Sequence, residues 1–339
     1  MSPGSEGARS ARSAELCRLL GAEHPIIEGG MAYVGNAELA AAVSKAGAFG
    51  QVGSGGLTPG ELEEEIRKTL DLTDRPFGVN LPIGTHKDPS RLVDVILRAR
   101  EEHGPALRAV SLSAGNPRPY IPVFKERGLA VMVVVSTVRQ ALKAEEAGAD
   151  VLVAESFEAG GHNGPAELAG FALFPAVSRA AKVPVVAAGG IVDGRTMAAA
   201  LILGASGVQV GTRFIATAEC RAHGVYKDAL VAARDEDTVI IERSVGRVTR
   251  VLRAPYALRV LEIEKQRPTL EELQPYTNGE KNRVAALEGR LDGGYAYCSQ
   301  AGSLIDEILP AGEVVRRMAT EACEVLGEAA ALAPCGPPS

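Results

Sequence analysis

Apolar residues occur along this chain in two alternating patterns. Eight short runs, of which residues 131–135 (Val-Met-Val-Val-Val) are the clearest, are apolar as is typical of parallel strands buried on both faces. Between them, apolar residues recur at three- and four-residue spacing over helical lengths. The predicted strands span residues 25–28, 49–53, 77–82, 109–113, 130–136, 151–154, 185–188 and 208–211, and the helices 36–46, 59–70, 89–102, 138–147, 166–181 and 194–203. This alternation predicts an α/β protein, and eight strands favour a (β/α)8 TIM barrel.

A glycine-rich segment with one histidine, residues 155–165 (Glu-Ser-Phe-Glu-Ala-Gly-Gly-His-Asn-Gly-Pro), follows the sixth predicted strand. The active sites of TIM barrels lie at the carboxyl ends of the strands. Glycine lets the main chain approach a ligand closely, and an imidazole titrates near neutral pH and transfers protons in either direction. His162 is therefore the first catalytic candidate. The alternative is a loop histidine that only hydrogen-bonds to its neighbours.

Glycines also follow the seventh and eighth predicted strands. Gly189 and Gly190 come after the seventh strand, and Gly211 and Thr212 after the eighth. The loops after these two strands of a TIM barrel commonly hold a phosphate through main-chain N–H groups and a helix N-terminus. The pattern therefore indicates a phosphate site, with ordinary strand-to-helix turns as the alternative.

Five motifs occur in the order and at the spacing of one known family. They are residues 25–31 (Pro-Ile-Ile-Glu-Gly-Gly-Met), 77–80 (Phe-Gly-Val-Asn), 158–162 (Glu-Ala-Gly-Gly-His), 187–190 (Ala-Ala-Gly-Gly) and 211–214 (Gly-Thr-Arg-Phe). With them, the chain from about residue 24 to about residue 260 resembles the flavoprotein family of nitronate monooxygenases, formerly 2-nitropropane dioxygenases, which includes the type II enoyl-acyl-carrier-protein reductases. The resemblance implies a TIM barrel with non-covalently bound FMN.

The resemblance also implies roles for particular residues, with His162 as the catalytic one. The implied cofactor-binding residues, of which the last five would hold the phosphate, are Gly30, Met31, Asn80, Glu155, Gly160, Gly161, Ala188, Gly189, Gly190, Gly211 and Thr212. Our candidates for lining the substrate pocket, with a surface position as the alternative, are Tyr295, Tyr297 and Gln300.

The family contains two activities that share one flavin site. In the monooxygenase, His162 would bind an anionic nitronate or take a proton from a neutral nitroalkane, and O2 is the oxidant. In the reductase, NADH or NADPH supplies electrons and an enoyl thioester is reduced. Residues 293–302 (Gly-Gly-Tyr-Ala-Tyr-Cys-Ser-Gln-Ala-Gly) depart from the Met-Ala-Gly-Gln pattern of the reductases, and Val134 stands where some quinone-reducing relatives have lysine. We favour the nitronate monooxygenase; the reductase and an inactive ligand-binding barrel are the alternatives.

These patterns divide the chain into five parts. Residues 21–235 form the predicted FMN-binding barrel. Residues 236–300 form a predicted small, mainly helical cap, too polar for a core of its own, which closes the substrate pocket or is a peripheral decoration. We expect residues 301–330 to contain a C-terminal helix that returns to the barrel. Residues 1–20 are predicted to be a disordered tail, and residues 331–339 a frayed end.

Composition narrows the range of partners. The 36 basic and 42 acidic residues give a net charge of −6, and aromatic residues make up 4% of the chain with no Trp, so neither charge nor stacking favours nucleic acid. No apolar stretch approaches the roughly 18 residues of a membrane helix. The five cysteines are scattered and predict neither a disulfide framework nor a metal site. We expect a cytoplasmic enzyme with a small-molecule substrate, and a homodimer is compatible with these features.

Overall fold

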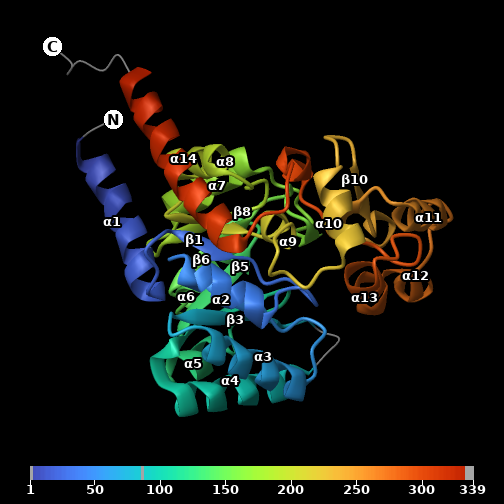
Figure 1. Ribbon diagram of the computed structural model, residues 1–339, viewed down its shortest axis with the longest axis horizontal. Helices are drawn as coiled ribbons and strands as arrows, with labels where there is room; N and C mark the ends of the chain where they lie inside the picture. Colours follow the sequence, from blue (N-terminus) through green and yellow to red (C-terminus); the bar gives the residue numbers. More distant parts are fainter. Residues whose placement is uncertain (1–2, 85–87, 333–339) are drawn as a thin grey trace.

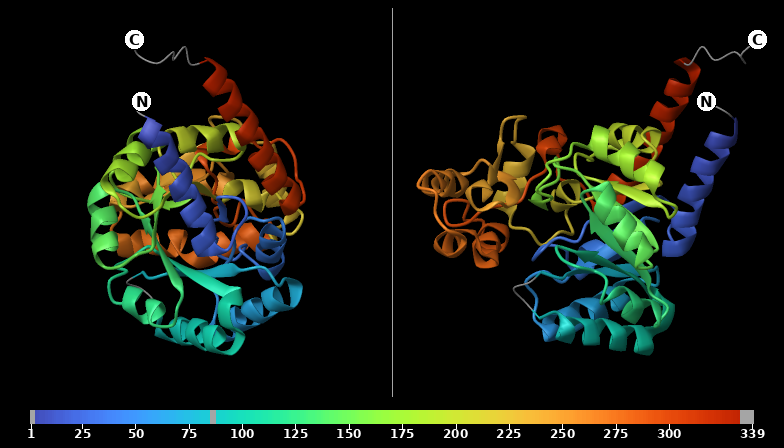
Figure 2. Two further views of the ribbon diagram at one scale, coloured as in Figure 1. Left: turned by 90° about the vertical axis from the view of Figure 1, so that its left-hand side faces the viewer. Right: turned by 180° about the vertical axis from the view of Figure 1, so that it is seen from behind.

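The computed structural model describes residues 3–84 and 88–332, and a barrel of eight parallel strands lies at its centre (Figures 1 and 2). The strands pair in the order β1-β9-β8-β6-β5-β4-β3-β2, and a parallel bridge between Ile27 and Phe49 joins β1 to β2 and closes the ring. All eight predicted strands are confirmed. Their bounds are β1 (Ile26–Glu28), β2 (Gly50–Gly53), β3 (Phe77–Pro82), β4 (Leu107–Ser113), β5 (Ala130–Val135), β6 (Val151–Glu155), β8 (Val185–Ala188) and β9 (Gly207–Val210).

Helices cover the outer face of the barrel. Capping boxes start two of them: Glu61 N–H donates to the side chain of Thr58 at α3, and Thr196 N–H donates to that of Asp193 at α8. Such boxes satisfy N–H groups that a helix leaves unpaired. The predicted helices are confirmed, and α5 and the 3-10 turn η1 (Gly104–Ala106) are additional. The helices are α2 (Ala37–Lys45), α3 (Pro59–Leu72), α4 (Ser90–His103), α5 (Ile121–Lys125), α6 (Val138–Glu146), α7 (Gly170–Ala180) and α8 (Gly194–Ile202).

Helix α1 (Pro3–Leu20) lies across the N-terminal end of the barrel (Figure 2, left). Leu16 and Leu20, one helical turn apart, are fully buried in the cluster that contains Ile27 and Phe49. The prediction of a disordered tail is therefore wrong for residues 3–20. Leu16 and Leu20 fix the helix to the barrel. The glycine, serine and arginine residues around them lower the average hydrophobicity of the segment, so its composition does not indicate this contact.

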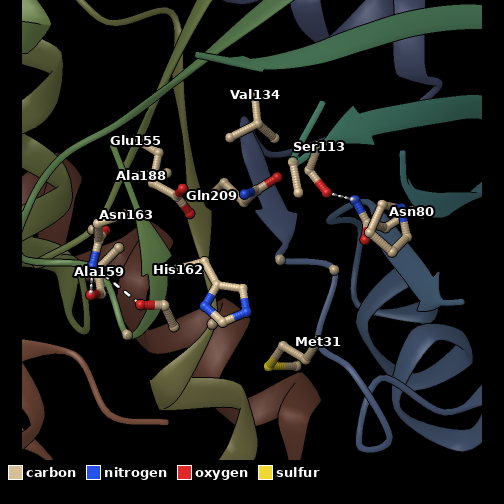
Figure 3. Close-up of a pocket in the computed structure, with 18 of the residues that line it drawn as sticks. Met31, Asn80, Ser113, Val134, Glu155, Ala159, His162, Asn163, Ala188 and Gln209 are labelled. Atoms are coloured by element: carbon tan, nitrogen blue, oxygen red, sulfur yellow. Dashed lines mark hydrogen bonds between the residues drawn. The ribbon is translucent and has the colours of Figure 1, made fainter. Parts of the chain in front are cut away.

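Apolar side chains fill the N-terminal half of the barrel. The buried cluster inside it includes Ile27, Phe49, Met132, Val153 and Val186. Because successive side chains of a strand point to opposite faces, the next inward position on each strand lies two residues further along. At the carboxyl ends of four strands these positions carry Val134, Glu155, Ala188 and Gln209 (Figure 3). Small and polar side chains thus replace the bulky apolar ones towards this end.

The cap contains a sheet as well as helices. Strands β10 (Thr238–Ile241) and β11 (Val248–Leu252) pair antiparallel, and β7 (Gly161–Asn163) adds to β11. A 3-10 turn, η2 (Arg243–Val245), joins β10 to β11, and the helices are α11 (Pro255–Glu264), α12 (Leu270–Thr277) and α13 (Gly279–Glu288), at the end of the barrel opposite α1 (Figure 1). The prediction that the cap has no core of its own is wrong. Its buried apolar side chains include Ile241, Val251, Tyr256, Val260 and Leu273.

The chain returns from the cap to the outer ring of helices. After β9 come the short helices α9 (Thr212–Ile215) and α10 (Gly224–Val231), then the cap, the 3-10 turn η3 (Gln300–Leu304) and α14 (Ala311–Leu332). Helix α14 packs between α8 and α2, and Gly194 N–H donates to Glu321 Oε2 on it. It therefore takes the position of the eighth barrel helix. It also extends two residues into the predicted frayed end, of which residues 333–339 lie outside the described part of the chain.

Candidate active site

A cavity of about 750 Å³ opens between the carboxyl ends of the barrel strands and the cap (Figure 3). Its wall includes residues from the ends of β1, β3, β5, β6, β8 and β9, together with β7 and the segment that follows α13. This is the face at which TIM barrels hold their substrates. A volume of this size lies within the range of sites for cofactors and small molecules.

The cavity brings together most of the residues that the sequence predicted for the site. The predicted residues in its wall are Gly30, Met31, Asn80, Glu155, Gly160, Gly161, His162, Ala188, Gly189, Gly190, Gly211, Thr212 and Tyr297. Two predicted substrate residues are elsewhere, which corrects their assignment. Tyr295 is 1% exposed in the cap core, where its hydroxyl donates to Thr277 O, and Gln300 is exposed on η3.

The loops after β8 and β9 present unpaired main-chain donors to the cavity. Among the described residues, no acceptor pairs with the N–H group of Gly190 or Gly211. Thr212 Oγ1 accepts a hydrogen bond from Ser299 N, so its own proton remains free to point elsewhere. A Cβ on Gly211 would meet only Met31 Sδ, at 3.9 Å, so the space in front of it is open. Unpaired donors beside open space fit a bound phosphate.

Other glycines of the site are required by the protein itself. Gly189 has φ +94°, and a Cβ there would lie 2.5 Å from Ser156 Oγ. A Cβ on Gly30 would lie 2.1 Å from Cγ of Asn80. The Asn80 amide in turn donates to Ser111 Oγ at 2.9 Å, which fixes its orientation in the wall. These glycines let the ends of β1 and β8 present small main-chain surfaces to the cavity.

His162 points into the cavity from a strand (Figure 3). The prediction placed it in a glycine-rich loop, but Gly161–Asn163 pairs with β11 and puts His162 directly opposite Thr249. The imidazole Nδ1 is 2.8 Å from Thr249 Oγ1, and the Tyr297 ring lies edge-on to it with centroids 5.8 Å apart. Thr249 Oγ1 donates to the buried carboxylate of Glu242 at 2.5 Å. The ring is held at Nδ1, and no described residue hydrogen-bonds to its other nitrogen.

Burial shifts the pKa of two titratable groups in the wall. His162 is exposed to the cavity, but the cavity lies deep in the protein, and the loss of bulk water lowers the pKa of the imidazole. The Glu242 carboxylate opposes this shift and Arg247 adds to it. Burial raises the pKa of Glu155 from 4.5 to about 7. The site therefore favours a neutral imidazole at neutral pH and holds a carboxyl group that titrates near the same pH.

Sequence reasoning missed several polar residues of the site. Gln209 lines the cavity, and its Oε1 atom is buried without a partner among the described residues. It is the polar residue within the short run of β9, and that is a signal that could have identified it. Ser113, a polar residue at the end of β4, also lines the cavity. Glu242 and Thr249 carry no such signal, because only the pairing of β11 with β7 brings them to His162.

The described residues contain no group of three or more side chains placed to ligate a metal ion. Cys220 and Cys298 are buried, and burial raises their thiol pKa values, to about 11 and about 12. The thiolate forms needed for metal binding or nucleophilic attack are thus disfavoured at neutral pH. No helix in residues 3–84 or 88–332 has the length and apolar character needed to cross a lipid bilayer.

The fold and the site define a (β/α)8-barrel enzyme with unpaired main-chain donors and His162 at the carboxyl ends of its strands. The sequence model for nitronate monooxygenase matches residues 13–321. Nitronate monooxygenase of Pseudomonas aeruginosa is 34% identical over 347 residues, covering 90% of this chain and 97% of that protein. The chain belongs to the nitronate monooxygenase family, a family of flavin-dependent oxidoreductases, and this confirms the resemblance.

Two further relatives differ in their names. FabK from Thermotoga maritima is 40% identical with a TM-score of 0.87, and the match covers 94% of this chain and 99% of that one. The (3aS,4S,5R,7aS)-5-hydroxy-7a-methyl-1-oxo-octahydro-1H-indene-4-carboxyl-CoA dehydrogenase of Rhodococcus jostii is 37% identical over 237 residues, 70% of this chain. The match spans 65% of that dehydrogenase's length. The family therefore includes proteins of more than one named activity.

Proposed function

We propose that this protein is an FMN-dependent nitronate monooxygenase. The observation that carries the proposal is the placement of His162, with one ring edge free, in the same cavity as the unpaired donors of Gly190 and Gly211. A flavin held by its phosphate at those donors would extend into the cavity. When bound, FMN supplies the electron transfer between substrate and O2 that none of the side chains in the wall performs.

The protein's own residues then bind and orient. Gly190, Gly211 and Thr212 would hold the phosphate, and Asn80 would contact the ring system from β3. Burial lowers the pKa of His162 and so favours the neutral imidazole. The imidazole would take a proton from the α-carbon of a neutral nitroalkane or bind a nitronate. The sequence near the proposed phosphate site contains no glycine-rich motif of the kind that binds dinucleotides. Its absence favours FMN over FAD.

A second candidate is an NAD(P)H-dependent enoyl-thioester reductase. It is favoured by the similarity to FabK, which at 40% identity extends over nearly the whole chain, cap included. In this reaction His162 would bind or protonate near the thioester carbonyl. The two candidates require opposite roles for the histidine, as a base in the first and as a donor in the second.

The two candidates are separated by which donor reduces the flavin without oxygen. The purified protein should be yellow and release FMN on denaturation. Under anaerobic conditions, propyl nitronate should bleach the flavin, while NADH and NADPH should not. Bleaching by a nicotinamide cofactor but not by the nitronate would replace the monooxygenase with the reductase, and a colourless protein that takes up no FMN would leave a ligand-binding barrel.

Substitution of Gly211 tests where the phosphate binds. Gly211→Leu should yield largely flavin-free protein, because its side chain would enter the open space before Met31. Gly60→Leu is the matched control, since a Cβ there meets nothing within 4 Å and Gly60 is outside the cavity wall. Full flavin content in folded Gly211→Leu protein, measured by absorbance, would contradict the placement.

Replacement of His162 tests its role. His162→Ala should retain flavin and lose about 10²-fold or more in kcat/KM on a neutral nitroalkane, the scale of general base catalysis. The flavin spectrum serves as the control for an intact cofactor site. Wild-type rates on every accepted substrate would make the histidine a structural residue.

A further inference from the structure

Three side chains form a hydrogen-bonded chain that runs from the cavity into the cap. His162 Nδ1 is 2.8 Å from Thr249 Oγ1, and Thr249 Oγ1 is 2.5 Å from Glu242 Oε2. Thr249 and Glu242 are each 1% exposed and lie outside the cavity wall. Neither can touch a substrate in the cavity, so any part that they play in the reaction must act through His162.

The directions of these two hydrogen bonds follow from the number of protons available. A carboxylate can only accept, and a threonine hydroxyl has a single proton. Thr249 donates that proton to Glu242, so it can only accept from the imidazole. The proton of the neutral ring therefore lies on Nδ1. The other nitrogen, Nε2, then carries a lone pair on the ring edge that remains for the cavity.

Charged groups surround the buried end of the chain at Glu242. Arg247 Nη1 lies 3.7 Å from Glu242 Oε1. Glu264 faces the same turn, where its Oε2 accepts from Glu242 N and its Oε1 from Ser244 Oγ. The Tyr297 and His162 rings lie in a T-shaped arrangement. A proton acquired by Nε2 would make the imidazole positive, and the buried carboxylate would stabilise that charge across Thr249.

We propose that Thr249 and Glu242 are positioning residues that hold His162 with its proton on Nδ1 and so keep Nε2 available as the base for a neutral carbon acid. In the step concerned, the α C–H bond of a nitroalkane breaks, the proton forms a bond to Nε2, and the electron pair remains on the substrate as the nitronate. The choice of nitroalkane rests on the proposed function. The tautomer itself does not.

The tautomer can be measured directly in the flavin-loaded, full-length protein with ¹⁵N-labelled histidine. Long-range ¹H–¹⁵N correlations distinguish the two neutral forms, and His162→Gln identifies the signals of His162. The wild-type protein should show the Nδ1–H form. Thr249→Val, which keeps the shape and removes the hydroxyl, should shift the ratio of the two forms by about tenfold towards Nε2–H, in keeping with the loss of a buried hydrogen bond. Thr249→Ser should restore the wild-type ratio.

A Glu242→Gln variant tests the far end of the chain. A glutamine amide can donate to Thr249 Oγ1, which frees the threonine proton for His162 Nδ1. The share of the Nε2–H form should therefore rise. An Nε2–H form in the wild type, or a ratio that neither Thr249→Val nor Glu242→Gln alters, would overturn the proposal whatever the protein's substrate is. The wild-type measurement decides this even where a variant does not fold.

Turnover provides the second readout through a matched pair of substrates. A neutral nitroalkane must lose its α proton in the site, whereas the preformed nitronate of the same compound has already lost it. Thr249→Val should lower kcat/KM by about tenfold on the neutral compound, with Thr249→Ser close to wild type. On the nitronate, Thr249→Val should stay within about twofold of the wild type. Equal losses on both compounds would reduce Thr249 to a structural residue, and an absence of turnover by the wild type would overturn the proposed function while leaving the tautomer result intact.

Discussion

The raised pKa of Glu155 should make the flavin-free protein less stable as the pH rises. The pKa is about 7 in the folded protein and 4.5 for the ordinary carboxyl, a difference of 7 − 4.5 = 2.5 units. Between these pH values the folded state holds a proton that the unfolded state has released, so the free energy of unfolding falls with increasing pH. At 1.36 kcal/mol per unit, the total loss is at most about 3–4 kcal/mol. Water in the cavity makes this an upper value.

Urea denaturation at a series of pH values, from about pH 4.5 to about pH 8, measures this effect. The comparison is between the wild type and Glu155→Gln, which keeps the shape of the side chain and cannot ionise. Titration of His162 and other groups is common to both proteins and cancels in the difference. The variant should gain stability relative to the wild type as the pH passes from 4.5 to 7. A difference that is constant over this range would refute the reasoning.

Two further substitutions test contacts that hold the fold around the site. Leu20→Ala should lower the free energy of unfolding by about 2–5 kcal/mol, because the side chain is 1% exposed in the barrel interior; a urea midpoint equal to that of the wild type would mean that α1 does not close the barrel in solution. Arg250 donates to Phe157 O and lies 4.4 Å from the centroid of the Phe157 ring. Arg250→Met should therefore speed hydrogen exchange in Gly161–Asn163 while that of β3 and β4 is unchanged, and equal exchange in β7 would contradict this account.

The barrel could be predicted because its signals are local. Strands buried on both faces are apolar throughout, as in residues 131–135, and the count of eight led to the ring closed by Ile27 and Phe49. Helix α1 was missed because its packing depends on Leu16 and Leu20 alone. Strand β7 was missed because Gly-His-Asn has little tendency to form a strand. It is extended because β11, far along the chain, supplies its hydrogen bonds.

The site residues, too, could be predicted where their signal is local and could not where it depends on distant packing. Glycines such as Gly190 and Gly211 were found because their position after a strand has a direct meaning in a barrel. Tyr295 and Tyr297 are equivalent in the sequence, two residues apart and both aromatic, yet only Tyr297 lines the cavity. The packing of the cap helices decides between them, since the Tyr295 hydroxyl is held by Thr277 O in the cap. No local pattern contains that information.

Because Thr249 lies directly opposite His162, the neighbour of the histidine depends on the pairing of two strands. A slip of β11 by one residue against β7 would bring Val248 or Arg250 opposite His162, because paired strands slip by whole residues. The histidine would then acquire an apolar or a positively charged neighbour while every glycine around the cofactor stayed in place. The pairing of β11 with β7 thus decides which side chain acts on the imidazole Nδ1, and no strand of the barrel takes part in that choice.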